Sequence, residues 1–211
     1  MSALLRVNSA GERFINEWLP NQSLANAIAS QAGAWCWLLL DSNAGESLKR
    51  MAGPESMGSG DAQAASLSAL PDLVKTGTAI QANSLDELAQ GMKVPAATLR
   101  ATVERYNGFV ATGIDLDFQK DARHLTPLAK PPLFAVKEGT LAMTTVSGLK
   151  INANAQVLDL EGKVIPGLYA GGNASGGFFN NAYPHQVNGM SLGRCMTFGY
   201  IAGRHATTGK V

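Results

Sequence analysis

The sequence has few cysteines, almost no net charge and no long hydrophobic run. Its 211 residues include two cysteines, Cys36 and Cys195, and contain no CxxC or Cys/His metal spacing. We therefore predict two buried free thiols and no metal site. The formal net charge is +1, which gives no electrostatic reason to expect nucleic acid as a partner. No apolar run approaches the roughly 18 residues that a membrane span requires.

Residues 1–20 lack the basic start and apolar centre of a secretory signal, so the sequence predicts a cytoplasmic protein. Hydrophobic residues make up 45% of the chain and charged residues 16%, a balance typical of a globular protein with a core. The composition changes near residue 140, from helical and polar before to glycine-rich and strand-like after. We therefore predict two domains, 1–139 and 140–211.

Several local patterns predict individual helices and strands. Ser23 is expected to cap a helix over 24–31, and the apolar run 34–40 predicts a buried strand. Ser84 and Glu87 form a capping box for the next helix.

The remaining elements are predicted from composition and from runs of apolar residues. Residues 42–66 are predicted to form a loop with at most one short helix, and the polar segment 113–132 a loop whose Arg123 and His124 are exposed. A short strand is expected at 141–145, and a long helix over 190–206.

The most informative stretch is GLYAGGNASGGFFNNAYPHQVNGMSLGRCMTFGYIAGRH, residues 167–205. It predicts a strand, a tight glycine turn, a loop and a helix entered through Asn188 and Gly189. Free amides and the positive dipole end at a helix start favour an electron-rich ligand atom, and the small residues there would admit a flat ligand. The alternative is a buried helix whose glycines serve only close packing. Physical reasoning alone leaves both readings open.

Four segments resemble one protein family, and they occur in its order. VNSAGERFINE (7–17) resembles the entry to a cap domain, and 84–118 resembles the cap helices and the acidic loop after them. The segments 148–173 and 191–206 resemble the return to a flavin domain and its last helix. The family is the fumarate reductase / 3-ketosteroid dehydrogenase flavoprotein superfamily. The resemblance implies an α+β chain: a substrate-cap domain followed by the C-terminal strand-and-helix part of a flavin-binding α/β domain.

The resemblance also implies FAD as the cofactor and places its contacts. Gly171, Gly172 and Asn173 match the turn that meets the ribityl chain. Asn188, Gly189, Met190, Ser191 and Leu192 match the helix start that faces the pyrimidine edge of the flavin. Such donors stabilise negative charge on the reduced flavin. The family's GxGxxG fingerprint occurs nowhere in the sequence, so we expect either a partner that carries the nucleotide-binding half or a truncated chain.

The substrate residues of fumarate reductases are changed at all three matching positions. The cap arginine corresponds to Asn21, the histidine to Met143 or Thr144, and the last arginine to Tyr183 or, counted from the other side, Gln186. A dicarboxylate needs fixed cations, so the resemblance favours the ketosteroid dehydrogenase type and an apolar or enone-like substrate.

Two loop residues are the catalytic candidates. Tyr183 matches a ketosteroid dehydrogenase tyrosine and would polarise a carbonyl or relay a proton, unless it only packs beside Pro184. His185 would be a base or a substrate contact, or a solvated loop histidine. The implied activity is hydride transfer between flavin and a carbon–carbon bond next to a carbonyl. The alternative is a non-catalytic remnant, or a subunit that needs a separate FAD-binding partner.

Overall fold

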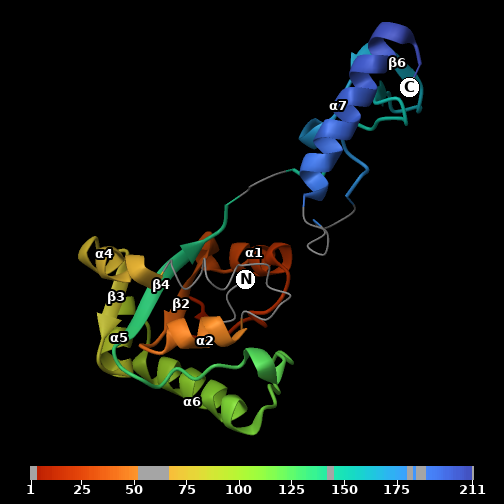
Figure 1. Ribbon diagram of the computed structural model, residues 1–211. Helices are drawn as coiled ribbons and strands as arrows, with labels where there is room; N and C mark the ends of the chain where they lie inside the picture. The colour runs from red at the N-terminus through yellow and green to blue at the C-terminus, as the bar shows by residue number, and fades with distance from the viewer. Residues whose placement is uncertain (1–3, 52–66, 142–144, 180–182, 184–188, 211) are drawn as a thin grey trace. The chain divides into compact units, whose positions relative to one another are not determined.

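The computed structural model describes residues 4–51, 67–141, 145–179, 183 and 189–210. The chain forms two compact units, Met1–Thr140 (unit 1) and Leu141–Val211 (unit 2), shown in Figure 1. Both units combine helices with strands, in agreement with the predicted α+β class.

Unit 1 is built around a four-stranded antiparallel sheet in the order β1-β2-β4-β3. Its strands are β1 (Arg6–Val7), β2 (Trp35–Leu40), β3 (Ala79–Ala82) and β4 (Leu133–Gly139). The two central strands pair along their length, from Trp35 opposite Gly139 to Leu40 opposite Phe134. The buried strand predicted at 34–40 is confirmed, because its apolar side chains fill cores on both faces of the sheet.

Helices cover both faces of this sheet. They are α1 (Asn21–Ala29), α2 (Ala44–Met51), α4 (Leu70–Lys75), α5 (Leu85–Met92) and α6 (Ala96–Thr112). Trp37 and Leu39 point to the core formed with α5 and α6, which lie together on one side of the sheet in Figure 1. Cys36 and Leu40 alternate to the other face and pack in the clusters that include α1 and α2.

The sequence predicted the residues that cap two helices, Ser84 and Ser23. The capping box is confirmed, because Ser84 Oγ accepts from the Glu87 amide at 3.2 Å, and the Glu87 carboxylate accepts from the Asn83 amide at 2.8 Å. The cap predicted at Ser23 is wrong. Helix α1 begins at Asn21 directly after Pro20, which places Ser23 inside its first turn.

Two other expectations in unit 1 are corrected. Helix α4 was not predicted, and α2 is a short helix in the part of 42–66 that the structure describes, since residues 52–66 lie outside it. His124 is buried in the short helix η4 (Ala122–His124), where its ring stacks on Trp18 with centroids 3.6 Å apart. The segment after α6 is thus packed against unit 1 rather than solvated throughout, although Arg123 itself is exposed.

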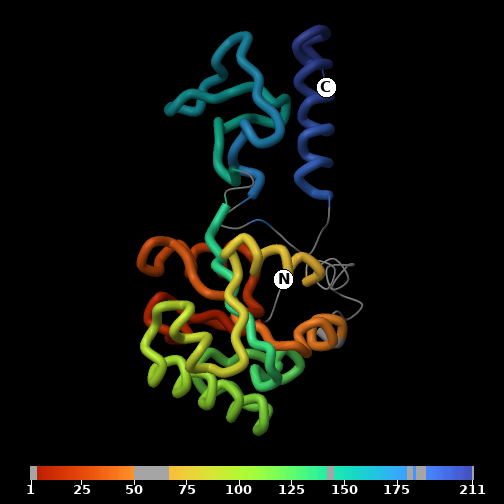
Figure 2. The backbone as a smooth tube through the Cα atoms, turned by 90° about the vertical axis from the view of Figure 1, so that its left-hand side faces the viewer, coloured from red at the N-terminus to blue at the C-terminus, as the bar shows by residue number. Residues whose placement is uncertain are grey.

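The described part of unit 2 consists of a two-stranded antiparallel hairpin, a glycine turn and one long helix. Its elements are β5 (Gln156–Leu158), β6 (Val164–Tyr169), η5 (Gly172–Ala174) and α7 (Met190–Thr208). Figure 2 shows α7 as a straight rod beside the turns of its own unit. Tyr169 OH and His205 Nδ1, 3.0 Å apart, tie β6 to the end of this helix. The helix predicted over 190–206 is confirmed.

Other details of unit 2 differ from expectation. The strand predicted at 141–145 is not formed at Leu141 or Thr145, and residues 142–144 lie outside the described residues. Cys195 is exposed, so the prediction that both thiols are buried holds only for Cys36. Sequence reasoning placed Cys195 in an apolar helix without knowing which face of that helix would be covered.

One backbone crossing in unit 2 is unusually close. A Cβ at Gly148 would lie 2.5 Å from the Ala174 carbonyl oxygen, and a Cβ at Gly176 would lie 2.5 Å from the Gly148 carbonyl oxygen. The Leu149 amide donates to Ala174 O, and the Gly176 amide donates to Leu149 O. The segment before β5 and the segment after the glycine turn therefore need glycine at their contact.

Candidate functional site

The glycine turn after β6 lies against α7. A Cβ at Gly172, whose φ is +60°, would lie 2.7 Å from Cys195 Sγ, and one at Gly171 would lie 3.4 Å from Phe198. These two glycines therefore let the turn and the helix approach one another. Close packing accounts for both of these turn glycines, and a flavin contact at this turn remains a proposal.

The side chain beyond the glycines joins the turn to the helix start. Asn173 Oδ1 accepts from Arg194 Nη2 at 3.1 Å and lies 3.5 Å from Ser191 Oγ. Arg194 Nη1 also reaches Ser175 O at 3.5 Å. Asn173 is exposed, whereas Arg194 is only 3% exposed. Asn173 and Ser191, 18 residues apart in the chain, are thus brought to one place.

Helix α7 begins without a side-chain cap. Gly189 precedes it with φ +77°, and the first intrahelical bond runs from the Gly193 amide to Gly189 O at 2.8 Å. The amides of Met190, Ser191 and Leu192 precede that bond, and so they have no intrahelical acceptor. A Cβ at Gly189 or Gly193 would meet nothing within 4 Å. As far as the described residues show, the helix start is therefore open to a flat, electron-rich ligand.

An aromatic group lies beside the same turn. The rings of Phe178 and Phe179 have centroids 5.0 Å apart, and those of Phe179 and Tyr183 are 4.9 Å apart. The Arg194 guanidinium lies 4.7 Å from the Phe179 centroid and 5.5 Å from that of Phe178. Tyr183 thus belongs to the neighbourhood of Arg194. The other catalytic candidate, His185, lies outside the described residues, as does Asn188.

A shallow cavity of about 380 Å³ opens on the same unit. Lys150, Asn152 and the backbone of Gly176 line one part of it, and Phe178 and Phe198 line another. Its walls combine aromatic faces with a few polar groups, a mixture typical of small-molecule sites.

Unit 1 contains a buried cluster of charged side chains of its own. Arg13 contacts Glu17 at 2.9 Å and Asp115 at 2.7 Å, and Lys120 contacts Glu17 at 2.9 Å and Tyr106 OH at 3.0 Å. The side chains of Glu17, Asp115 and Lys120 are 0% exposed. Two cations and two carboxylates neutralise one another away from solvent, which is the arrangement expected of a structural cluster.

The pKa shifts in this cluster support a structural role. Burial raises the pKa of Asp115, but hydrogen bonds from Arg13 and from the Lys120 and Phe118 amides outweigh it and lower the pKa to about 2. Burial lowers the pKa of Arg13, and its bonds to Asp115 and Glu17 outweigh this and raise the pKa. Both groups therefore stay charged at ordinary pH, which makes them poor proton donors or acceptors.

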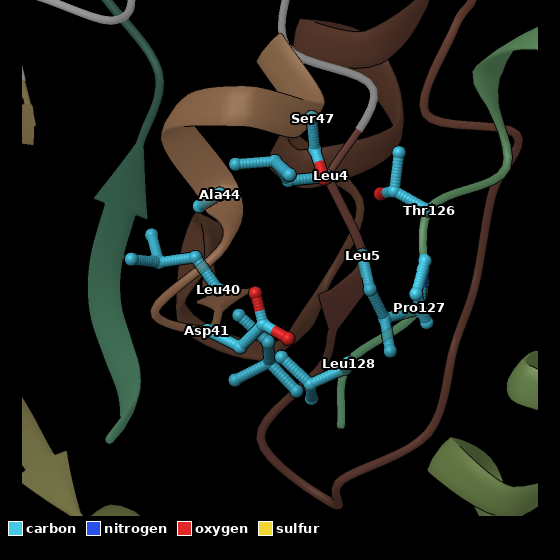
Figure 3. A pocket seen from close by; sticks show the side chains of 10 residues that line it. Leu4, Leu5, Leu40, Asp41, Ala44, Ser47, Thr126, Pro127 and Leu128 are labelled. Atoms are coloured by element: carbon cyan, nitrogen blue, oxygen red, sulfur yellow. The ribbon is translucent and has the colours of Figure 1, made fainter. Parts of the chain in front are cut away.

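The pocket in Figure 3 is a small gap in unit 1, with a cavity of about 10 Å³. Leu4, Leu5, Leu40 and Leu128 form much of its wall, and Asp41 is beside them. The Asp41 carboxylate accepts from three backbone amides, at 2.9 to 3.1 Å. The space holds about one water molecule and no substrate.

Among the residues that the structure describes, no group of three or more His, Cys, Asp or Glu side chains is placed to hold a metal ion. No helix in that part of the chain is long and apolar enough to cross a membrane.

A family model decides what this architecture belongs to. The model of the FAD binding domain matches residues 2–190. The chain belongs to the FAD binding domain family. FAD is therefore the cofactor that family membership indicates.

Two of the chain's relatives represent the two kinds of enzyme that the sequence motifs resemble. The chain is 30% identical to the probable fumarate reductase Ifc3 of Shewanella frigidimarina, over 95% of this chain and 30% of that protein. It is 33% identical to the 3-oxosteroid 1-dehydrogenase of Mycobacterium tuberculosis, over 62% of this chain and 25% of that protein.

A solved structure supports the same superfamily assignment. The 3-ketosteroid delta1-dehydrogenase from Sterolibacterium denitrificans matches with a TM-score of 0.74 and 26% identity, over 99% of this chain and 39% of that one. The predicted superfamily is thereby confirmed. The chain spans 39% or less of the length of each of these three proteins.

The residues of unit 2 fit one end of the FAD that this family binds. The open start of α7 and the exposed Asn173 amide supply N–H donors at a surface where Gly189 and Gly193 leave room. Donors of this kind suit the electron-rich edge of a flavin. No GxGxxG motif occurs in the sequence, so the residues present fit the flavin end of the cofactor and not its adenosine end.

Sequence reasoning missed Arg194. It named the neighbouring Ser191 and Leu192, but read the helix only for small residues. Arg194 falls on the same face of α7 as Phe198 and His205, which are both partly covered. A helical wheel drawn for residues 190–208 places Arg194 on the same face as Phe198 and His205. This pattern was the signal in the sequence by which Arg194 could have been found.

Proposed function

We propose that this chain is the substrate-cap and C-terminal flavin-contacting portion of an FAD-dependent oxidoreductase. Residues 1–139 would form the cap, and 140–211 the last part of the FAD-binding domain. The reaction is hydride transfer between flavin and a carbon–carbon bond next to a carbonyl, as in ketosteroid dehydrogenases rather than fumarate reductases. The observation that carries the proposal is the contact of Asn173 with Ser191 and Arg194, which joins the glycine turn to an open helix start.

The chain's own residues have distinct tasks in this reaction. FAD, when bound, supplies the hydride chemistry. The amides of Met190, Ser191 and Leu192 donate to its electron-rich edge, and Gly189 leaves the space for its approach. The turn Gly171–Asn173 holds the neighbouring part of the cofactor. Because the helix amides are fixed before binding, they need no reorganisation when charge develops.

Aromatic side chains favour an apolar, enone-like substrate. Phe178 and Phe179 lie next to Tyr183, and the guanidinium beside these rings, that of Arg194, already donates to Asn173 and Ser175. In the proposed reaction the Tyr183 hydroxyl polarises the substrate carbonyl or relays a proton, with His185 as the second candidate. The aromatic rings exclude water from the reacting carbon atoms.

A second candidate function is a subunit that acts only with the nucleotide-binding part of a flavoprotein. The exposed face of α7 favours it: Leu192, Met196 and Tyr200 are 67%, 69% and 66% exposed. These positions, four residues apart, share one face, and the strand β6 is also largely exposed. Exposed apolar side chains gathered on one helix face are typical of an interface, and a nucleotide-binding part would supply the GxGxxG fingerprint.

Flavin binding tests the proposal with a matched pair of variants. FAD would be titrated into the chain alone and into the chain combined with the nucleotide-binding part of a relative, with flavin fluorescence as the measurement. Gly193→Leu places a bulky side chain beside the proposed site, and Gly203→Leu places the same side chain on the same helix nearly three turns away. Neither new Cβ would meet an atom within 4 Å, so both variants should fold.

We expect Gly193→Leu to weaken FAD binding at least about tenfold, and Gly203→Leu less than about threefold, because only the first blocks a close approach to the helix start. Equal losses would remove the start of α7 from the cofactor site. Absence of FAD binding in both forms of the experiment would contradict the enzyme proposal and favour a non-catalytic remnant.

A further inference from the structure

We propose that Arg194 is a positioning residue that fixes the Asn173 side-chain amide as a hydrogen-bond donor toward an electron-rich atom of the ligand. The inference rests on the proposed flavin site. It adds Arg194 to that site and specifies that the Asn173 side chain acts there as a hydrogen-bond donor. Its support comes from three features of Arg194: a buried charge that no described carboxylate contacts, a directional bond to Asn173 and a rigid aromatic support.

The first feature is the charge. Buried cations ordinarily contact carboxylates, because an unpaired charge away from water is costly. In unit 1, Arg6 contacts Glu138 at 2.6 Å, and Lys120 contacts Glu17 at 2.9 Å. Arg194 is buried to the same degree and contacts no carboxylate among the described residues. Its Nε has no hydrogen-bond partner there either. The positive charge is therefore only partly compensated by the part of unit 2 that the structure describes.

The second feature is the direction of the bond to Asn173. Arginine has donors and no acceptor, so the Asn173 atom 3.1 Å from Arg194 Nη2 must be the amide oxygen. Ser191 Oγ lies 3.5 Å from the same oxygen and adds a weaker contact. With its oxygen turned to α7, the amide directs its Nδ2 hydrogens elsewhere. Asn173 is exposed, and Nδ2 has no acceptor among the described residues, so it can donate to a ligand.

The third feature is the support behind the guanidinium. The faces of Phe178 and Phe179 lie 5.5 and 4.7 Å from its carbon, and Nη1 reaches Ser175 O. Aromatic faces attract the cation and restrict its rotamers. The bond to Asn173 is thus made from a fixed donor, and the orientation of the amide is set before a ligand arrives.

The arrangement specifies what the ligand must present. An amide N–H and a partly compensated cation behind it both favour an acceptor with negative character, such as an electron-rich oxygen or nitrogen. An aspartate at position 173 would instead pair with Arg194 and offer no donor. Asn173→Asp is therefore the variant that reverses the polarity while keeping the size of the side chain.

The test uses the flavin-loaded protein, with its nucleotide-binding part where the titration above requires one. The variants are Arg194→Met, Arg194→Lys, Asn173→Asp and the double variant Asn173→Asp/Arg194→Met. Arg204→Met is the control, since Arg204 lies on the exposed face of the same helix. The readouts are the FAD dissociation constant and the sulfite dissociation constant, the latter followed by bleaching of the flavin's visible absorbance. Sulfite gives an anionic flavin product, which a nearby positive charge stabilises.

We expect Arg194→Met and Asn173→Asp each to weaken FAD binding about tenfold, and the double variant to weaken it more than either single variant, because the carboxylate at position 173 then has no guanidinium to neutralise it. Sulfite binding should weaken about tenfold in Arg194→Met and return to within about threefold of wild type in Arg194→Lys, which keeps the charge. Arg204→Met should change neither constant.

The outcomes separate this inference from the function on which it rests. A wild-type protein that binds no FAD overturns both. A wild-type protein that binds FAD while Arg194→Met binds it equally tightly overturns only the role of Arg194. If Arg194→Met fails to fold, the Asn173 side-chain amide resonances in Arg194→Lys decide: unchanged chemical shifts would show that Arg194 does not hold this amide.

Discussion

The two units differ in how completely their own residues bury apolar side chains and neutralise buried charges. Unit 1 encloses three apolar clusters between its sheet and helices, and its buried cations contact carboxylates. In unit 2 the long helix exposes Leu192, Met196 and Tyr200, and the buried Arg194 has no carboxylate among the described residues. The same chain therefore contains one unit with a closed core and one unit whose exposed apolar side chains and buried cation could be covered and neutralised by a bound molecule.

The difference concerns the origin of stability. A fully buried apolar side chain contributes about 1.5 to 3 kcal/mol, so a unit with many of them needs no ligand to fold. A unit with an uncovered helix face gains stability from whatever covers it. We infer that FAD or a protein partner would stabilise unit 2 and leave unit 1 nearly unchanged.

The largest expected contrast is in thiol reactivity. Burial, with help from Glu138, raises the pKa of Cys36 in unit 1 to about 12, whereas Cys195 in unit 2 is exposed. Relative to a thiol at the reference value of 9.0, the Cys36 shift alone removes about a thousandfold of the thiolate at neutral pH. A disulfide reagent such as DTNB should therefore label one thiol of the native protein rapidly and the second only after unfolding.

The variant Cys195→Ser is the control for this labelling. It should show almost no native reactivity, while Cys36→Ser should keep the rapid phase. Rapid labelling of Cys36 in the native protein would show that unit 1 opens readily. It would contradict the inference that unit 1 has a closed core and unit 2 does not.

The next largest effect is expected from the buried ion cluster. Glu17→Gln removes the carboxylate that both Arg13 and Lys120 contact, at a side chain with 0% exposure. Breaking such a buried pair costs about 3 to 5 kcal/mol. Urea unfolding followed by tryptophan fluorescence measures it in unit 1 specifically, since all three tryptophans lie there.

An exposed ion pair supplies the matched comparison. Glu46 contacts Lys49 at 3.3 Å with both side chains well exposed. Glu46→Gln should change the free energy of unfolding by less than about 0.5 kcal/mol. If Glu17→Gln lowers the free energy of unfolding by as little as this, the cluster is solvated, and the buried charges of unit 1 do not depend on one another for neutralisation.

The smallest of the three effects is acid sensitivity. The folded pKa of Asp115, about 2, lies below the reference value of 3.8. The stability that this shift contributes is therefore present above pH 4 and lost as the pH falls toward 2. It amounts to about 2 kcal/mol. The fluorescence of unit 1 in urea at several pH values measures the loss.

Asp115→Asn isolates this contribution from the other carboxylates that titrate in the same range, among them Asp121. The variant will be less stable at neutral pH, but its stability should fall less between pH 4 and pH 2 than that of the wild type. Parallel curves would assign the acid sensitivity to other groups.

Local signals in the sequence predicted the local structure well. The bonds of the capping box at Ser84 connect residues at most four positions apart, so pattern and structure contain the same information. The helix from Met190 was likewise predicted from its own residues. Ser23 failed because Pro20, three residues earlier, also starts helices, and composition alone did not rank the two signals.

Long-range pairings were beyond such reasoning. Arg13 and Asp115 are 102 residues apart, and nothing in either neighbourhood predicts that they meet. For the site, the sequence predicted the turn Gly171–Asn173 and the start of α7, but not that Arg194 would join them. That contact depends on which face of α7 is covered, and a sequence read for motifs does not report the covered face.

The contact of Gly148 with Gly176 has a consequence for anyone who mutates the gene. Every other amino acid has a Cβ, and at either position that atom would lie 2.5 Å from a carbonyl oxygen. A saturation scan would therefore score both codons as intolerant, with the profile that is usually taken to mark an active site. Here backbone crowding alone produces that profile, so tolerance maps of this chain should be corrected for it before catalysis is assigned.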